Sequence, residues 1–286
     1  MTLNYEKIMA HNPGDIAVRY TKNDSIFYAL SIGIGMDPMD AGQLKYVYER
    51  DLEAFPAMAS SLGWMGRLTD PEYGIDARMV VASDLGVELH APLPAEGELV
   101  SRPRVKGIVD KGAGNAAIVQ FERDLYDASG TKLATIRNSI LARNHGGFGG
   151  KVTTPAEPHA VPGGAPDLTC DLPTPPNLAL LFRLNGDTNP IHVDPDRAKA
   201  AGFPRPLLHG AASYGIAAHA LMRTVADYHT ERFGSMEARF ARPVFPGETL
   251  RTEIWVRGDE VSFRCRTVER GEVALDNGLL RLRPGR

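Results

Sequence analysis

The middle of the chain limits most strongly how this polypeptide can fold. Between Asn144 and Pro176, glycine and proline recur at short intervals, and we expect no regular helix or strand there because both residues interrupt such structure. A loop of this length is uncommon inside one compact domain. We therefore predict two domains of similar size, residues 1–145 and residues 176–286, joined by a linker at residues 146–175.

Both halves carry a similar block in which one strand ends, the chain turns, and another strand begins. The turn contains Pro92 and Gly97 in the first half, and Pro243 and Gly247 in the second. Gly247 lies 150 residues after Gly97, and each of these glycines is followed by glutamate. The matching blocks support a duplicated fold.

Hydrophobic periodicity predicts a similar order of elements in the two halves. The best helix spans Gly210–Tyr228, which is rich in alanine and contains no proline. Its counterpart, Phe55–Leu68, is shorter and carries two glycines. Strands are predicted at 100–109, 116–127 and 132–141, and again at 252–256, 261–268 and 279–282. An apolar helix with an antiparallel sheet covering it, twice over, is an α+β fold.

The charge balance excludes one large class of function. Lys and Arg total 32 against 35 Asp and Glu, which gives a formal net charge of −3. Proteins that bind nucleic acid or a membrane surface through bulk positive charge need the opposite balance. We therefore expect neither partner, while a local basic patch for a phosphorylated ligand remains open.

The sequence favours a cytoplasmic protein. Its two cysteines, Cys170 and Cys265, form no Cys-x-x-Cys pair and suit a reducing compartment as core thiols. No secretory signal is recognisable, the last residues are not a Ser-Lys-Leu peroxisomal signal, and no apolar run approaches the ~20 residues that cross a bilayer.

Polar residues gather between two short predicted helices. The first helix, Pro176–Leu184, is stopped by Gly186, and the second begins with Asp194 as its N-cap. Asp187 and His192 therefore lie on one tight loop, where their side chains can converge. A carboxylate and an imidazole that hold the same water are suited to general acid–base chemistry.

The start of the long helix offers a second chemical feature. Its first backbone N–H groups have no partner within the helix, and Gly210 has no side chain to block a ligand. Together with the helix dipole, they suit a carbonyl oxygen that gains negative charge during a reaction. A water held by Asp187 and His192 beside such a donor can add across a double bond conjugated to a carbonyl.

The same stretch resembles a known family. The matching residues are Phe182-Arg183-Leu184, Gly186-Asp187, Asn189-Pro190, His192, Asp194-Pro195, Ala198, Gly202-Phe203, Pro206 and Leu208-His209-Gly210. They resemble the MaoC-like hydratase 2 family of (R)-specific enoyl-CoA hydratases and 3-hydroxyacyl-CoA dehydratases. Phe27–Gly35 and Leu44–Glu49 are similar to the degenerate first domain of its two-domain members. The resemblance implies a double hot-dog fold, two repeats that each wrap an antiparallel sheet around a central helix, with the N-terminal helix shortened.

The resemblance also implies roles for single residues. Asp187 and His192 match the pair that activates water, Asn189 matches a residue that supports the pair, and Gly210 matches the donor to the thioester oxygen. Family members add water reversibly to a trans-2-enoyl-CoA to give a (3R)-3-hydroxyacyl-CoA, with no metal or redox cofactor. The C-terminal half is then catalytic, and the N-terminal half accommodates the acyl chain. The first half lacks an Asp-x-Asn-Pro-x-His segment, which agrees with this division.

Each of these residues also has a structural explanation. Asp187 is a common turn residue, His192 can be a satisfied buried histidine, Asn189 can hold the turn before proline, and Gly210 can be a permissive helix start. We expect His209 to support the site by fixing the loop.

A metal site is a further alternative, because Asp187, His192, Asp194 and His209 are all ligand-type residues. Asp194 is better explained as a helix cap, and no tight His or Cys spacing is present, so we expect no metal.

Two other functions use the same residues. A thioesterase would direct the water to the thioester carbonyl, and a non-catalytic protein would bind acyl-CoA without turnover. We expect an acyl-CoA thioester as the substrate and a homodimer as the assembly, although two fused repeats can also satisfy the usual pairing internally.

Overall fold

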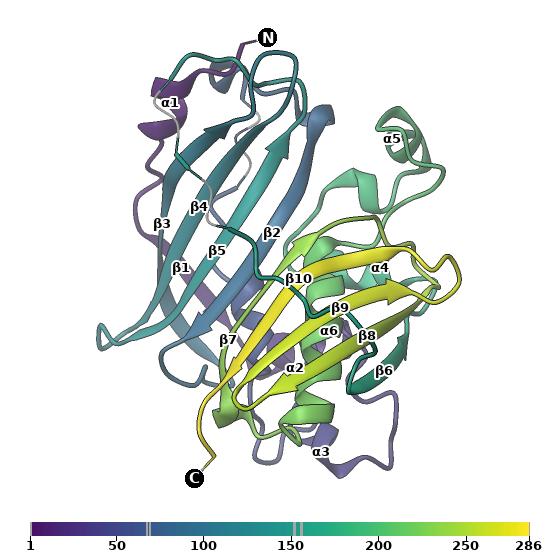
Figure 1. Ribbon diagram of the computed structural model, residues 1–286. Helices are drawn as coiled ribbons and strands as arrows, with labels where there is room; N and C mark the ends of the chain where they lie inside the picture. Colours follow the sequence, from purple (N-terminus) through teal and green to yellow (C-terminus); the bar gives the residue numbers. More distant parts are fainter. Residues whose placement is uncertain (1, 67, 69, 151–152, 155–156, 286) are drawn as a thin grey trace.

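All ten strands of the described residues belong to one large curved sheet. The computed structural model describes residues 2–66, 68, 70–150, 153–154 and 157–285. Within these residues, antiparallel strands pair in the order β1-β3-β4-β5-β2-β7-β10-β9-β8-β6 (Figure 1). The strands are β1 (Ile16–Tyr20), β2 (Val80–Leu89), β3 (Gly97–Asp110), β4 (Ala117–Asp127), β5 (Lys132–Ala142), β6 (Leu168–Pro173), β7 (Phe233–Phe240), β8 (Thr249–Arg257), β9 (Glu260–Thr267) and β10 (Val273–Leu282). The two halves of the chain meet where β2 pairs with β7.

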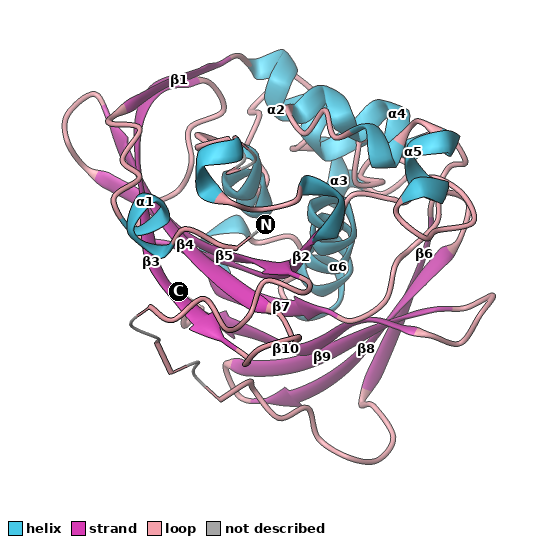
Figure 2. Ribbon diagram, turned by 90° about the horizontal axis from the view of Figure 1, so that it is seen from above, coloured by secondary structure: helices cyan, strands magenta, loops and turns pink. Residues whose placement is uncertain are grey.

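The main helices lie on one side of this sheet, as Figure 2 shows for α2, α4 and α6. The α-helices are α1 (Tyr5–Met9), α2 (Lys22–Leu30), α3 (Ala41–Leu44), α4 (Leu178–Phe182), α5 (Pro195–Ala200) and α6 (Gly210–Val225). Short 3₁₀ helices are η1 (Pro56–Ser61), η2 (Pro71–Tyr73), η3 (Ala77–Met79), η4 (Arg183–Asn185), η5 (Pro190–His192) and η6 (Thr230–Arg232).

Helix α6 forms the centre of the molecule. Every residue from Ala212 to Met222 is buried, as expected for a helix that is apolar on all sides. It contacts β6, β7 and β8 of its own half, and β2 and η1 of the first half. The predicted helix at 210–228 is confirmed but ends at Val225, because Asp227 and Tyr228 turn the chain with φ values of 47° and 56°.

The first half has only the 3₁₀ helix η1 as its central helix. This helix packs against β2, β5 and α6, which confirms the predicted shortening. Arg123 on β4 donates hydrogen bonds to the carbonyl oxygens of Ser60 and Leu62, at 2.5 and 2.8 Å, and so satisfies the end of η1. Burial of this guanidinium lowers the pKa of Arg123 to about 9. The sheet and its central helices confirm the predicted α+β, double hot-dog architecture.

One expectation about the middle of the chain is wrong. The stretch between Asn144 and Pro176 contains strand β6, which pairs with β8 from Leu168↔Ile254 to Pro173↔Thr249. β6 lies at the edge of the sheet and ends on its proline, and an edge position tolerates a residue that lacks an N–H group. The glycine and proline residues of this stretch therefore limit the length of the strand but do not prevent it from forming.

The contact of α6 with the first half can be tested at Gly215. A Cβ there would lie 2.6 Å from Cγ2 of Ile32 and 3.0 Å from the Tyr28 hydroxyl. Gly→Ala in a helix ordinarily stabilises by about 1 kcal/mol, but overpacking a core costs about 1–3 kcal/mol. We expect Gly215→Ala to lower the free energy of unfolding by about 1 kcal/mol in urea denaturation.

The Ile32→Ala background supplies the control, because it removes the clashing methyl group. In that background the same glycine substitution should become neutral or stabilising. Stabilisation in the unaltered background would show that α6 and Ile32 do not pack in this way.

Candidate active site

The Asp187 loop is built by local hydrogen bonds. Gly186 ends η4 with a φ of 111°, a conformation that favours glycine. The Asp187 Oδ1 atom then accepts the backbone N–H of Asn189 at 3.1 Å, and Asn189 Oδ1 accepts the N–H of Ile191 at 3.3 Å. In the structure Asn189 thus caps η5 and shapes the turn that carries His192.

His192 is held in one tautomer when its ring is neutral. Its Nδ1 lies 3.0 Å from the carbonyl oxygen of Leu207, and this oxygen can only accept, so Nδ1 carries the hydrogen. Nε2 is then the basic nitrogen, and it lies 3.8 Å from Oδ2 of Asp187. The His192 side chain is 11% exposed and that of Asp187 is 47% exposed, so the pair sits at the edge of solvent.

His209 packs directly on His192. The two rings stack with 3.7 Å between centroids and an interplanar angle of 27°. His209 Nε2 donates to the carbonyl oxygen of Asp187 at 3.1 Å, and its buried Nδ1 has no hydrogen-bond partner among the described residues. Burial, followed by the charge of His192, lowers the pKa of His209 to about 4. His209 is therefore uncharged at neutral pH.

Gly210 follows His209 as the first residue of α6. Its N–H belongs to the first turn, which has no acceptors within the helix. A Cβ at Gly210 would lie 3.1 Å from the Phe240 ring, so the glycine allows this aromatic side chain to pack closely beside the helix start.

Two segments separated in sequence come together here. Leu207 donates its N–H to the carbonyl oxygen of Ile191 at 3.3 Å, while His192 binds the carbonyl oxygen of Leu207. As a result, one ligand-type atom from each of Asp187, His192 and His209 lies within 4.8 Å of the others. The structure therefore places the predicted residues of the loop and of the helix start in one cluster.

The same cluster is the place where a metal ion could bind. However, the His192 and His209 rings are stacked, so the lone pairs in the two ring planes run nearly parallel and do not converge on one point. This is a poor geometry for coordinating one ion. Asp194 is occupied as the N-cap of α5, where its carboxylate accepts the N–H groups of Asp196 and Arg197. The cap was predicted from the sequence and is confirmed.

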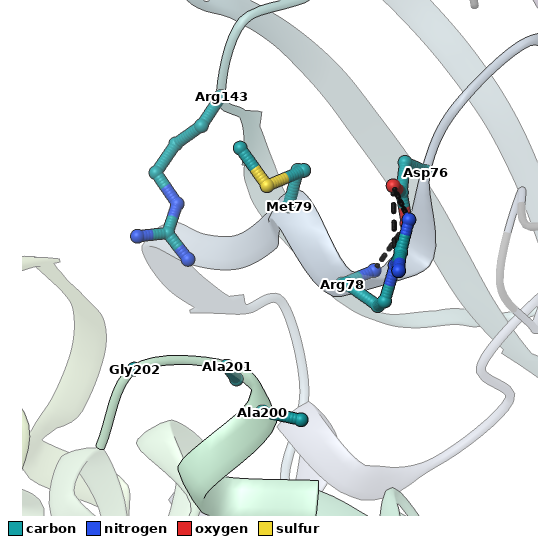
Figure 3. A pocket seen from close by; sticks show the side chains of 7 residues that line it. All are labelled: Asp76, Arg78, Met79, Arg143, Ala200, Ala201 and Gly202. Carbon is teal, nitrogen blue, oxygen red and sulfur yellow. Dashed lines mark hydrogen bonds and ion pairs between the residues drawn. The ribbon is translucent and has the colours of Figure 1, made fainter.

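Two adjoining clefts are lined by residues from both halves of the chain, and the sequence analysis named none of their charged residues. The smaller cleft, about 350 Å³, is lined by Asp76, Arg78, Met79, Arg143, Ala200, Ala201 and Gly202 (Figure 3). The larger cleft, about 670 Å³, shares Met79 and Arg143 and extends to Lys111, Arg239 and Phe240. These residues are scattered along the chain, so no sequence motif could have grouped them.

Comparison with known proteins shows the family to which this chain belongs. The family model described as MFE-2 hydratase 2 N-terminal domain matches residues 18–144, and the one described as MaoC like domain matches residues 157–277. The chain is 34% identical to "Enoyl-CoA hydratase 2, peroxisomal" of Arabidopsis thaliana, over 95% of this chain and 93% of the relative. It belongs to the MaoC-like hydratase 2 family.

Some relatives of this MaoC-like chain are much longer than it, and others are of similar length. It is 38% identical to "Enoyl-CoA hydratase ChsH3" of Mycobacterium tuberculosis, over 84% of each chain. It is 35% identical to the mouse "Peroxisomal multifunctional enzyme type 2" over 99% of its residues, but spans only 39% of that enzyme's length. A solved MaoC-like dehydratase from Phytophthora capsici superposes with a TM-score of 0.87 at 30% identity, covering 99% of this chain and all of the other. No helix within the described part of this MaoC-like chain could span a bilayer.

The depressed pKa of His209 predicts how the stability of this MaoC-like chain depends on pH. Its value is about 4 in the folded protein against an ordinary 6.5, so between these values the unfolded chain binds a proton that the folded chain does not. Stability is therefore lost as the pH falls. From pH 7 to pH 5, this residue should lower the free energy of unfolding by about 2 kcal/mol.

The measurement compares denaturation curves of the wild type and His209→Gln at both pH values. Gln keeps a donor for the Asp187 carbonyl but cannot be protonated, so the variant should lose about 2 kcal/mol less on acidification. His219, whose pKa burial also lowers to about 4, contributes equally to both proteins. An identical pH dependence in the two proteins would contradict the assignment of a neutral His209.

Proposed function

We propose that this chain catalyses the reversible addition of water to trans-2-enoyl-CoA thioesters, giving (3R)-3-hydroxyacyl-CoA. The observation that carries the proposal is the pairing of Asp187 Oδ2 with the basic nitrogen of His192, 3.8 Å apart, beside the start of a long buried helix. Relatives named as enoyl-CoA hydratases, similar over most of this chain, support the same reaction.

The geometry suggests how the pair acts. A water that contacts both Asp187 Oδ2 and His192 Nε2 lies between two groups that accept and return protons. Its oxygen forms the bond to C3 of the substrate while the C2=C3 electron pair moves toward the thioester oxygen. One member of the pair accepts a proton from the water, and this proton passes to the other member, which delivers it to C2. Both water hydrogens are then in the product, and the site returns to its starting state.

The start of α6 contributes electrostatic stabilisation in this proposal. The thioester oxygen gains negative charge when the double bond is attacked, and the N–H of Gly210 with the dipole of α6 can stabilise it. Asn189 supports the pair by capping η5, and His209 supports it by stacking on His192.

The remaining assignments follow from the same proposal. Residues 176–286 form the catalytic part together with strand β6, residues 1–145 accommodate the acyl chain beside the short helix η1, and the remainder of residues 146–175 connects them. We further propose that the protein is a homodimer and acts in the cytoplasm. The reaction needs neither a metal ion nor a redox cofactor.

The acid–base pair can be tested by substitution. Asp187→Asn and His192→Gln each keep the size of the side chain but impair its proton transfer, so each should lower kcat by about 10²–10⁴-fold. The measurement is the loss of enoyl-thioester absorbance with crotonyl-CoA and a longer trans-2-enoyl-CoA, in the presence and absence of a chelator.

The outcomes separate the alternatives. Release of free CoA with the enoyl group intact would favour a thioesterase, and tight substrate binding without turnover in the wild type would favour a non-catalytic binding protein. Loss of activity on chelation would contradict the metal-free mechanism.

The role of the Gly210 N–H can be tested with two matched variants. Gly210→Pro removes the donor, and proline is well tolerated at the first position of a helix. The preceding His209 has φ −58° and ψ 138°, which is compatible with a following proline. Gly210→Ala keeps the N–H and adds a similar Cβ contact with Phe240.

We expect Gly210→Pro to have a kcat about 10²–10³-fold lower than Gly210→Ala, because one oxyanion donor contributes about this much. Circular dichroism and denaturation should show that both variants fold. Equal activity of the two variants would exclude the N–H of Gly210 as the donor.

A further inference from the structure

One contact between the two halves lies directly beside the Asp187 loop. Asn185, the last residue of η4, donates a hydrogen bond from Nδ2 to Oγ of Ser31 at 2.9 Å. Ser31 is the residue that ends α2 in the first half, and Asn185 lies two residues before Asp187. The family resemblance does not use Asn185, although the residues on both sides of it match. The motif therefore does not account for this contact.

The hydrogen bonds around Ser31 fix the direction of the contact. Ser31 is buried, and its hydroxyl donates to the carbonyl oxygen of Tyr28 at 2.7 Å. Because that hydrogen is already used, Oγ can only accept from a second partner. Asn185 supplies the donor, and its Nδ2 also donates to the carbonyl oxygen of Phe182 at 3.1 Å. Ser31 therefore connects the end of α4 and η4 to the first half.

A second contact of α2 leads to the histidine side of the proposed reaction centre. The ring centroids of Tyr28 and Phe182 are 6.2 Å apart, and both side chains are buried. The Phe182 ring in turn lies 5.2 Å from the ring of His209, which stacks on His192. Helix α2 and its last residue thus contact both the segment that leads into Asp187 and the aromatic side chain that packs on His209.

The position of η4 affects the Asp187 carboxylate directly. Gly186, the single residue between Asn185 and Asp187, ends η4 with a φ of 111° and turns the chain. The Asp187 side chain is 47% exposed, so its place depends on the backbone of its loop more than on burial. Its Oδ2 must stay near Nε2 of His192 for one water to contact both groups. A displacement of ~1 Å in such a geometry can lower the rate by about 100-fold.

We propose that Ser31, acting through Asn185, is a positioning residue for the Asp187–His192 pair. The inference rests on the proposed function, because it assigns Ser31 a role in that reaction. It gives the first half a part in catalysis besides accommodation of the acyl chain, since the end of α2 holds the loop from which Asp187 acts. Loss of the contact should affect kcat more than KM, because the contact places the groups that activate water.

The test is a double-mutant cycle on kcat with crotonyl-CoA. Ser31→Ala removes the acceptor and Asn185→Ala removes the donor, and each should lower kcat about tenfold while KM stays within about twofold. If the two residues act through their mutual hydrogen bond, the double variant should also be about tenfold slower than the wild type. A loss of about 100-fold in the double variant would show that the residues act independently and would overturn the proposal.

Ser25→Ala supplies a matched control on the same helix. Ser25 is buried like Ser31, and its hydroxyl donates to the carbonyl oxygen of Ala95, within the first half, at 2.6 Å. Each substitution deletes one buried hydroxyl, so both should lower the midpoint of urea denaturation to a similar extent. Only Ser31→Ala should lower kcat. A wild-type kcat in Ser31→Ala, or an equal loss of kcat in Ser25→Ala, would overturn the proposal.

A spectroscopic measurement separates this proposal from the proposed function. The ring ¹⁵N resonances of His192, assigned with His192→Gln, report on its surroundings whether or not the protein turns over an enoyl thioester. They should shift in Ser31→Ala and keep their wild-type positions in Ser25→Ala. Unchanged His192 resonances in Ser31→Ala would overturn the positioning role. Failure of the proposed function would instead appear as a wild type that converts no enoyl thioester, while the His192 resonances still respond to Ser31→Ala.

Discussion

Helix α6 is buried from Ala212 to Met222, between the strands of the second half and the short helix η1 of the first. The side chains of this helix are therefore covered by neighbouring elements. The groups that α6 can offer to a ligand are the backbone N–H donors of its first turn. Because the residue before the helix is His209, the same packing also fixes the imidazole that stacks on His192. The buried helix thus positions both the proposed backbone donor and the proposed acid–base pair.

Main-chain carbonyl groups determine the chemistry of the two histidines. The carbonyl oxygen of Leu207 accepts a hydrogen bond from Nδ1 of His192, and the carbonyl oxygen of Asp187 accepts one from Nε2 of His209. The first contact directs the basic nitrogen of His192 toward the Asp187 carboxylate, and the second keeps His209 in place as an uncharged neighbour. His209 is uncharged at neutral pH, so it places no second positive charge 3.7 Å from the His192 ring.

Features with local sequence signals could be predicted, and features that depend on distant pairing could not. The helix at Gly210, the cap at Asp194 and the shortened helix near Pro56 each follow from breakers, caps and apolar spacing within a few residues. Strand β6 was missed because its pairing with β8 is non-local and forms despite the many glycine and proline residues around it.

The closeness of Asp187, His192 and His209 was expected from one loop and one helix start. By contrast, the basic clefts combine Arg78, Lys111, Arg143 and Arg239 from four separate elements, and only the assembled sheet brings these residues together.

The most direct test of this account follows the oxygen atom of the water. Turnover of crotonyl-CoA in ¹⁸O-labelled water should place the label on the 3-hydroxyl group of a product that is still a CoA thioester, as read by mass spectrometry. This result would show that the protein delivers water to C3, as the account requires. Label in a free carboxylate, together with released coenzyme A, would show attack at the carbonyl and would contradict the account.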